Sequence, residues 1–184
     1  VLGGGRSTRM GTDKATLEIF GRPMARWVAD AMRSSGVARI VALGGSAGLG
    51  LELVDDEPGG DGPLAALLGG LALGNPILVC PCDVPAVTPA VFDALIERWL
   101  VGDVPVVLAD SGHLEPLIGV YGPEIRPDLV AAFVEGVRGP KPALDADQFV
   151  TVPVDPSVVL NVNTPADLEA VRGLLRSRPE SRRG

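Results

Sequence analysis

The chain has 184 residues, of which 46% are hydrophobic and 21% are charged, and its formal net charge at pH 7 is −7. This length fits one globular domain of about 100–200 residues, and the composition excludes a wholly disordered chain. The excess of acidic residues argues against general nucleic-acid binding, because contacts to phosphates need an excess of lysine and arginine. No apolar run reaches the length of about 18 residues that a membrane-spanning helix needs, so we expect no contact with a membrane.

Cysteine and histidine are scarce in this sequence. Cys80, Cys82 and the single histidine, His113, are too few ligands for a structural zinc site. Two thiols in a chain of this size are typical of a reducing compartment, and no signal peptide is visible before the first glycines. We therefore expect a cytoplasmic protein with one domain at residues 1–176 and a charged, disordered tail at residues 177–184.

Short apolar runs rich in β-forming residues alternate with helical stretches. Strands are predicted at residues 1–2, 39–43, 51–54, 77–80, 104–109, 117–121 and 149–152. Helices are predicted at residues 24–33, 63–73, 89–100, 124–133 and 165–175, and Thr88 and Thr164 are the expected N-caps of two of them. This alternation predicts an α/β fold with a mainly parallel sheet flanked by helices, and such sheets bind ligands beyond the carboxyl ends of their strands.

The first predicted strand leads directly into a loop rich in glycine and basic residues. Its sequence is Leu2-Gly3-Gly4-Gly5-Arg6-Ser7-Thr8-Arg9-Met10-Gly11-Thr12-Asp13-Lys14. The glycines allow backbone N–H groups to approach a ligand closely, and Arg6, Arg9 and Lys14 add positive charge, so we expect this loop to bind a polyphosphate. It is neither a Walker loop nor the dinucleotide motif G-x-G-x-x-G, because Arg9 stands at the place of the last glycine.

A second candidate segment is acidic and ends in a Gly-Pro pair before an apolar helix. Its sequence is Asp55-Asp56-Glu57-Pro58-Gly59-Gly60-Asp61-Gly62-Pro63-Leu64. The Gly62-Pro63 pair is typical of a turn that leads into a helix N-terminus. The carboxylates beside it can accept hydrogen bonds from a nucleobase or a sugar hydroxyl, although an acidic surface turn would have the same composition.

Asp83 follows the apolar strand predicted at residues 77–80, in the segment Cys80-Pro81-Cys82-Asp83-Val84-Pro85. A carboxylate at the carboxyl end of a buried strand lies in the ligand crevice of an α/β sheet. Mg²⁺ prefers one or two protein carboxylates together with phosphates and water, so Asp83 suits a magnesium site; the alternative is a residue that caps a turn. The two cysteines are expected to be small buried residues.

Two further segments carry polar side chains near turns. His113 precedes a predicted strand, and a lone histidine there is expected to be a surface or packing residue without an acid–base role. The second segment is Asn161-Val162-Asn163-Thr164-Pro165-Ala166-Asp167-Leu168. It is typical of a capped helix start, in which Asp167 stands three residues after Thr164.

In order and spacing, four of these segments resemble the motifs of nucleotidyltransferases that join an NTP to a phosphorylated acceptor. The loop at residues 2–14 resembles their signature L-[AG]-[AG]-G-x-S-x-R-M-G-x-x-K, and its Asp13-Lys14 pair is similar to the molybdenum cofactor guanylyltransferase family, often called MobA. The other three segments resemble that family's D…GPLAG, C-P-C-D-x-P and N-V-N-T-P-x-D-L elements. The likeness extends from Val1 to about Val171 and implies a Rossmann-like nucleotidyltransferase fold.

The resemblance implies a reaction in which GMP passes from GTP to the terminal phosphate of Mo-molybdopterin and pyrophosphate leaves. It implies Mg²⁺ as the cofactor with Asp83 as its ligand, and a catalytic set of Arg9, Lys14 and Asp83. The residues implied to bind the substrates are Leu2, Gly3, Gly4, Gly5, Arg6, Ser7, Lys14, Asp56, Gly62, Asn161 and Asn163, with Asp55 as the alternative to Asp56 and no choice made between the asparagines. Transient contact with proteins that deliver or accept the cofactor is compatible with this role.

One departure from the family pattern concerns the nucleobase. Gly45 or Ser46 stands where family members often have an asparagine that contacts the nucleotide. The missing amide makes a cytidylyltransferase acting on the same pterin the nearest alternative. Gly4 and the Asp13-Lys14 pair favour guanine.

Two other functions are compatible with parts of the sequence. A sugar-1-phosphate nucleotidyltransferase is a further enzyme alternative, although such chains are usually longer. A non-catalytic nucleotide-binding module would keep the glycine-rich loop but would not need Asp83. Ala66 also replaces the usual second glycine of the GPLAG element, which is expected to affect helix packing and not chemistry.

Overall fold

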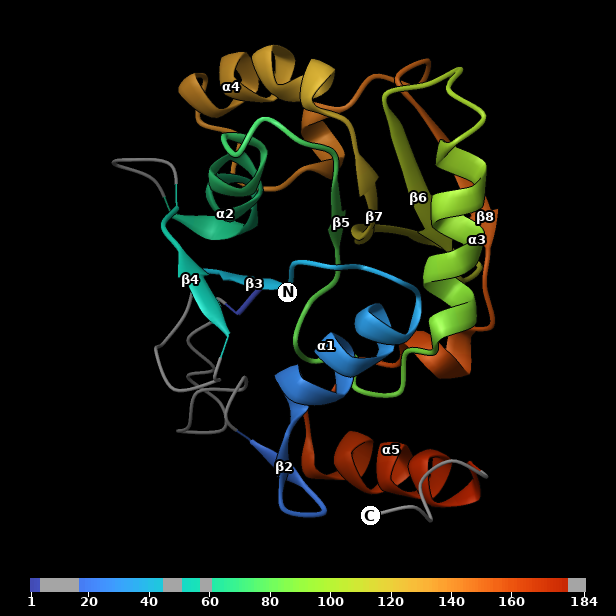
Figure 1. Ribbon diagram of the computed structural model, residues 1–184. Helices are drawn as coiled ribbons and strands as arrows, with labels where there is room; N and C mark the ends of the chain where they lie inside the picture. Colours follow the sequence, from blue (N-terminus) through green and yellow to red (C-terminus); the bar gives the residue numbers. More distant parts are fainter. Residues whose placement is uncertain (4–16, 45–50, 57–60, 179–184) are drawn as a thin grey trace.

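The computed structural model describes residues 1–3, 17–44, 51–56 and 61–178 (Figure 1). With η denoting a 3-10 helix, the elements are β1 (Glu18–Ile19), β2 (Arg22–Pro23), α1 (Met24–Ser34), β3 (Val41–Leu43), β4 (Glu52–Val54), α2 (Gly62–Leu71), β5 (Ile77–Val79), α3 (Pro89–Trp99), β6 (Val106–Asp110), β7 (Leu114–Tyr121), η2 (Pro123–Ile125), α4 (Arg126–Val134), η3 (Lys141–Ala143), β8 (Phe149–Pro153), η4 (Pro156–Val159) and α5 (Pro165–Ser177). Each helix and strand expected from the sequence has a counterpart here. No helix among the described residues is long and apolar enough to cross a membrane.

Residues 1–3 join two groups of strands into one sheet. Leu2 forms parallel bridges with Leu43 at the end of β3 and with Pro81 just after β5. β3 pairs in parallel with β4, β7 lies antiparallel between β5 and β6, and β6 pairs in parallel with β8. The order across the sheet is therefore β4, β3, residues 1–3, β5, β7, β6, β8. The expected mainly parallel sheet is confirmed, with β7 as its antiparallel exception.

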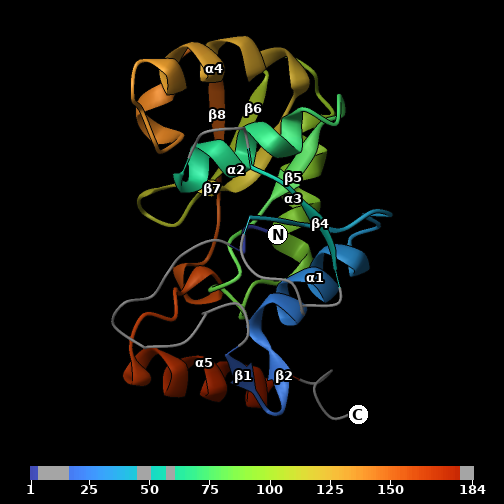
Figure 2. The same cartoon turned by 90° about the vertical axis from the view of Figure 1, so that its left-hand side faces the viewer.

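Helices cover both faces of this sheet (Figures 1 and 2). α1 and α3 pack on one face through an apolar cluster that includes Val28 and Leu95. α2 and α4 pack on the other face through a second cluster that includes Leu68 and Leu129. The sheet and α4 enclose α2, which explains why its sequence is apolar on every side.

α5 packs against the hairpin formed by β1 and β2 and against the start of α1 (Figures 1 and 2). Their shared apolar cluster includes Ile19, Val162 and Leu175. The hairpin turn consists of Phe20 and Gly21, whose φ angles of 54° and 74° are those of a type I′ turn. This hairpin was not expected from the sequence, because Asn-Gly and Asp-Gly are the usual residues of such turns and phenylalanine rarely adopts a positive φ.

Two helix boundaries differ from the sequence-based expectation. The helix expected at residues 124–133 begins at Arg126, because Pro123–Ile125 forms a 3-10 turn ahead of it. α5 continues to Ser177, the first residue of the expected tail, and Arg178 forms hydrogen bonds to the segment before α3. Residues 179–184 lie outside the described residues, so a disordered tail there remains a prediction.

The two expected helix caps differ in their hydrogen bonds. Thr164 forms a capping box: its hydroxyl accepts from the Asp167 N–H at 3.2 Å, and the Asp167 carboxylate accepts from the Thr164 N–H at 2.8 Å. Thr88 stands at the N-cap of α3, as expected, but its side chain makes no cap hydrogen bond.

This difference leads to a matched pair of stability measurements. We expect Thr164→Ala to lower the free energy of unfolding by about 1 kcal/mol in urea denaturation, because an amide at the start of α5 loses its acceptor. Thr88→Ala should lower it by much less, because no cap hydrogen bond is lost. Equal losses in the two variants would contradict the assignment of the capping box.

Candidate active site

The carboxyl ends of the parallel strands meet at one edge of the sheet. The chain passes from residues 1–3 to β3 and β4 on one side and returns through α2 to β5 on the other, so the strand order reverses between residues 1–3 and β5. Open α/β sheets bind ligands in the crevice at such a switch point. Gly3 and Asp83 stand directly beyond this point, and Gly44 and Asp56 follow the ends of β3 and β4. The structure thus brings three separately predicted segments to one edge.

The start of the glycine-rich loop is fixed in the middle of the sheet. The Leu2 N–H donates to the Cys80 carbonyl at 2.9 Å, and the Cys82 N–H donates to the Leu2 carbonyl at 3.0 Å. On the other side, the Gly3 N–H donates to the Leu43 carbonyl at 3.0 Å. Several predicted site residues lie outside the described residues: Gly4, Gly5, Arg6, Ser7, Arg9 and Lys14, together with Gly45 and Ser46. Their roles remain predictions.

Asp56 carries a buried acceptor atom close to the end of β4. Its carboxylate lies against Gly44, whose φ is +65° and where a Cβ atom would be 3.0 Å from Oδ1. Oδ1 is buried and accepts no hydrogen bond in the part of the chain that the structure describes. Burial, and after it the negative charge of Asp55, raises the pKa of Asp56. A buried acceptor without a partner is costly, so this position suits a ligand that brings an N–H or O–H donor.

Close packing of α2 positions Asp55 and Asp56. A Cβ atom on Gly69 would lie 2.2 Å from the Asp55 carbonyl oxygen. A Cβ atom on Gly70 would lie 2.9 Å from a methyl carbon of Leu43 at the end of β3. The two glycines therefore let the helix lie directly against the ends of the strands.

Gly62 has a conformational role at the start of α2. Its φ is +85°, and a Cβ atom there would lie 3.0 Å from the Arg138 carbonyl oxygen. The same oxygen accepts the Leu64 N–H at 3.0 Å, and the Arg138 guanidinium pairs with Asp61 at 3.3 Å. Since the Leu64 amide is already bonded and Pro63 has no N–H, little of this helix start is available to an anion. Direct contact of Gly62 with a substrate remains a prediction.

A backbone hydrogen bond joins Asp83 to the asparagine segment. The Val162 N–H donates to the Asp83 carbonyl at 2.8 Å. Val162 is buried, Asn161 and Asp83 are half-buried, and Asn163 is exposed. The structure therefore places side by side two segments that are far apart in the sequence and were predicted independently.

The turn between β6 and β7 adds a polar cluster to the same edge. The Ser111 hydroxyl donates to the Glu115 carboxylate at 2.7 Å, and His113 Nε2 lies 2.8 Å from Glu115 Oε1. Burial raises the pKa of the Cys80 thiol, and the negative charges of Asp83 and Glu115 contribute to this rise, which puts both carboxylates within electrostatic reach of Cys80. His113 is exposed, as expected of a surface residue. No role was predicted for Glu115. The feature of the sequence that could have singled it out is a carboxylate directly after a turn.

Comparison with known proteins identifies the family. A family model described as the MobA-like NTP transferase domain matches residues 1–152. The chain belongs to this family. The match includes the sheet edge around Gly3, Asp56 and Asp83, and it ends before Asn161, Asn163 and α5.

Individual MobA-like relatives extend the likeness over almost the whole chain. The molybdenum cofactor guanylyltransferase of Cereibacter sphaeroides is 33% identical over 190 residues, which covers 96% of this chain and 95% of the relative. The probable molybdenum cofactor guanylyltransferase of Chloroflexus aggregans is 33% identical over 193 residues, with 95% and 93% covered. The crystal structure of molybdopterin-guanine dinucleotide biosynthesis protein A from Archaeoglobus fulgidus has a TM-score of 0.76 at 21% identity, with 96% and 97% covered, and it shares the fold.

Asp83 is the carboxylate of this MobA-like chain that fits a site for a magnesium ion bound together with phosphates. In the ranges 1–3, 17–44, 51–56 and 61–178, no group of three or more His, Cys, Asp or Glu residues could hold a metal. Asp56 and Asp83 follow strands three positions apart, which is roughly 14 Å at the usual strand spacing, too far to share one ion. Magnesium needs only one or two protein carboxylates when phosphates and water complete its shell, and Asp83 meets this requirement.

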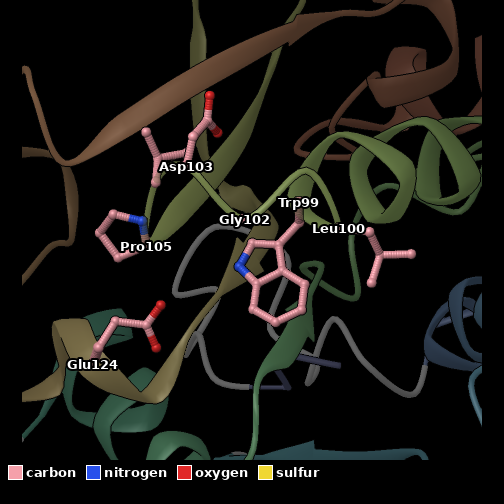
Figure 3. A pocket seen from close by; sticks show the side chains of 7 residues that line it. Trp99, Leu100, Gly102, Asp103, Pro105 and Glu124 are labelled. Carbon is pink, nitrogen blue, oxygen red and sulfur yellow. The ribbon is translucent and has the colours of Figure 1, made fainter.

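A cavity of ≈ 450 Å³ lies away from this site, at the opposite edge of the sheet (Figure 3). It is formed where α3 ends and β6 begins, and its lining includes Trp99, Asp103 and Glu124. None of its lining residues belongs to the predicted site. The candidate site at the open strand edge therefore does not include this cavity.

Asp56→Asn should raise stability and weaken nucleotide binding. Because the pKa of Asp56 is raised in the folded state, the charged carboxylate destabilises the fold above that pKa, and protonation relieves the effect as pH falls. The variant should therefore melt at a higher temperature than the parent protein near about pH 8, and this difference should shrink toward about pH 4. Its affinity for GTP should fall about tenfold, because the ligand loses a charged acceptor.

The exposed neighbour Asp55 provides the matched control for this substitution. Asp55→Asn should change both GTP affinity and the pH dependence of melting much less, in calorimetry and in thermal denaturation. The reverse pattern would transfer the binding role from Asp56 to Asp55.

Proposed function

We propose that this protein is a molybdenum cofactor guanylyltransferase, which transfers GMP from GTP to the terminal phosphate of Mo-molybdopterin and releases pyrophosphate. Curated relatives of that name support this proposal. The observation that carries it is the sheet edge: the glycine-rich loop starts at the switch point, and Asp83 stands beside it. The buried acceptor of Asp56, which has no donor among the described residues, follows a more distant strand.

The length of this edge suits a nucleotide that lies across the strand ends. In our proposal the base lies at Asp56 and the α-phosphate near Asp83, with the remaining phosphates toward the loop that begins at Gly3. Guanine presents its N1–H and N2–H₂ donors side by side, which complements a carboxylate. The equivalent edge of cytosine has one donor group next to the acceptor N3, which a carboxylate repels. The Asp56 acceptor therefore favours GTP over the CTP alternative.

The transfer depends on positioning more than on acid–base catalysis. An oxygen of the acceptor's terminal phosphate attacks the α-phosphorus in line, the bond from that phosphorus to the β-phosphate oxygen breaks, and pyrophosphate leaves with the electron pair. The attacking phosphate is already ionised, so it needs no strong general base. Arg9 and Lys14 are proposed to stabilise the leaving pyrophosphate, and Asn161 or Asn163 to orient the acceptor phosphate. Mg²⁺ held by Asp83 would neutralise charge on the phosphate oxygens.

Calorimetry with GTP and CTP in the presence of Mg²⁺ tests the proposal. We expect GTP to bind at least about tenfold more tightly than CTP. Pyrophosphate should appear only when GTP and the molybdopterin acceptor are both present. A preference for CTP would move the assignment to a cytidylyltransferase, and tight GTP binding without pyrophosphate release would favour a non-catalytic module.

A further inference from the structure

The segment that carries Asp83 is held at both ends by the C-terminal part of the chain. At one end, the Val162 N–H donates to the Asp83 carbonyl at 2.8 Å. At the other end, the Arg178 guanidinium donates to the carbonyls of Ala86 and Val87, the latter at 3.4 Å. Residues 83–87 are thus tied to residues on both sides of α5.

The held segment is buried, so its carbonyl groups need protein donors. Val84 and Ala86 are fully buried, and Val87 is 2% exposed. A guanidinium suits neighbouring carbonyls because its planar fork can donate to two acceptors at once. Arg178 is half-buried against these carbonyls, and this partial burial lowers the pKa of its guanidinium.

Both ties come from a part of the chain that the family model does not include. The match to the MobA-like domain ends at residue 152, whereas Val162 and Arg178 belong to the segment after β8. α5 also packs on the held segment, since Val171 and Leu175 share an apolar cluster with Ala86. The position of Asp83 therefore depends on contacts beyond the matched domain.

We infer that Arg178 is a positioning residue, which fixes residues 83–87 and thereby holds the Asp83 carboxylate where a magnesium–nucleotide complex binds. This inference rests on the proposed function, in which Asp83 is the magnesium ligand. Arg178 acts through the backbone of Ala86 and Val87 and touches no reacting atom. Of the two ties, only this one comes from a side chain and can be removed by substitution.

Three variants isolate this contribution. Arg178→Ala removes both donors, Arg178→Lys keeps the charge but lacks the planar fork that matches two neighbouring carbonyls, and Arg172→Ala is the control. Arg172 lies on α5, the helix that ends directly before Arg178, and pairs with Glu169 on its surface. Its loss removes the same charge from the C-terminal part of the chain, and Arg172 has no hydrogen bond to residues 83–87 like that of Arg178.

The first readout is the rate at which Cys82 reacts with a small maleimide in the protein without ligand, assigned by peptide mass spectrometry. Cys82 is 6% exposed and adjoins Asp83, while Cys80, fully buried at the end of β5, is the internal reference. Arg178→Ala should raise the Cys82 rate about tenfold relative to Cys80, because charge-assisted hydrogen bonds that keep the segment closed are lost. Arg178→Lys should give an intermediate rate, and Arg172→Ala the parent rate.

The second readout is the Mg²⁺ concentration at half-maximal GTP binding. It should rise about tenfold in Arg178→Ala and less in Arg178→Lys, with no change in Arg172→Ala.

A lower melting temperature of Arg178→Ala with unchanged Cys82 labelling and unchanged Mg²⁺ dependence would overturn the inference and make Arg178 an anchor of the chain end alone. If Arg178→Ala does not fold, the same criteria are applied to the measurements on Arg178→Lys. If the parent protein shows no Mg²⁺-dependent GTP binding, the proposed function fails, and Cys82 labelling still decides whether Arg178 holds the segment.

Discussion

Asp83→Asn is expected to lower turnover about 100-fold or more, because the loss of a catalytic metal ligand removes several kcal/mol of transition-state stabilisation. Asparagine keeps the shape of the side chain but removes the negative charge that attracts the metal. The hydrogen bond from Val162 should be kept, because the Asp83 backbone carbonyl accepts it, and the melting temperature without ligand checks that the variant is folded. Steady-state pyrophosphate release with GTP, acceptor and Mg²⁺ measures the effect.

Asp93→Asn is the matched control, because Asp93 is an exposed carboxylate on the neighbouring helix α3. It should leave turnover unchanged. Raising the Mg²⁺ concentration should recover only part of the activity of Asp83→Asn. Turnover near the parent level in Asp83→Asn at limiting Mg²⁺ would place the metal elsewhere, and Asp55, Asp56 or Asn163 would be tested next.

Gly69→Ala should damage both the fold and the nucleotide site. The added Cβ would lie 2.2 Å from the Asp55 carbonyl oxygen, and neither atom can move without a shift of the helix or the strand end. We expect the free energy of unfolding in urea to fall by about 1–3 kcal/mol, even though alanine favours a helix more than glycine does. GTP affinity should fall as well, because the shift displaces the neighbouring Asp56.

Gly173 in α5 is the control for this substitution, because a Cβ atom there would meet nothing within 4 Å. Gly173→Ala should therefore stabilise the protein by up to about 1 kcal/mol through helix propensity alone. A Gly69→Ala variant that is as stable as Gly173→Ala and binds GTP normally would mean that α2 does not position the acidic segment.

Much of the fold could be predicted because local signals agree with it. Pro89 and Pro165 mark the starts of their helices, and apolar runs mark the buried strands. The antiparallel direction of β7 follows from the tight turn after Asp110, since a parallel pair would need a long crossover. The hairpin at Phe20 escaped prediction because phenylalanine rarely adopts a positive φ. In the structure Phe20 is exposed, with the Arg176 guanidinium 5.2 Å from the centre of its ring, while the neighbouring Ile19 is fully buried.

The candidate site was predictable as separate segments but not as an arrangement. Asp83 and Asp56 could be singled out because each follows a strand of an α/β sheet. The contact between Asp83 and Val162 depends on how α5 packs, and no pattern in either segment encodes it. The requirement for glycine at position 69 could not be predicted either. It arises because the Asp55 carbonyl lies against α2, and the residue spacing within α2 does not reveal this contact.

The central place of residues 1–3 has a consequence for how the molecule folds. Leu2 pairs with Leu43 on one side and with Pro81 on the other, so this strand finds its full set of partners only after the chain up to residue 81 is in place. Closing such long loops costs more entropy than forming the β6–β7 hairpin, whose partners are neighbours in sequence. The strand at residues 1–3 has the partner most distant in sequence, Pro81, so we expect its pairing to complete the sheet late in folding. The base of the glycine-rich loop acquires its final geometry in that step. In refolding, the capacity to bind nucleotide is expected to return after most of the helical signal.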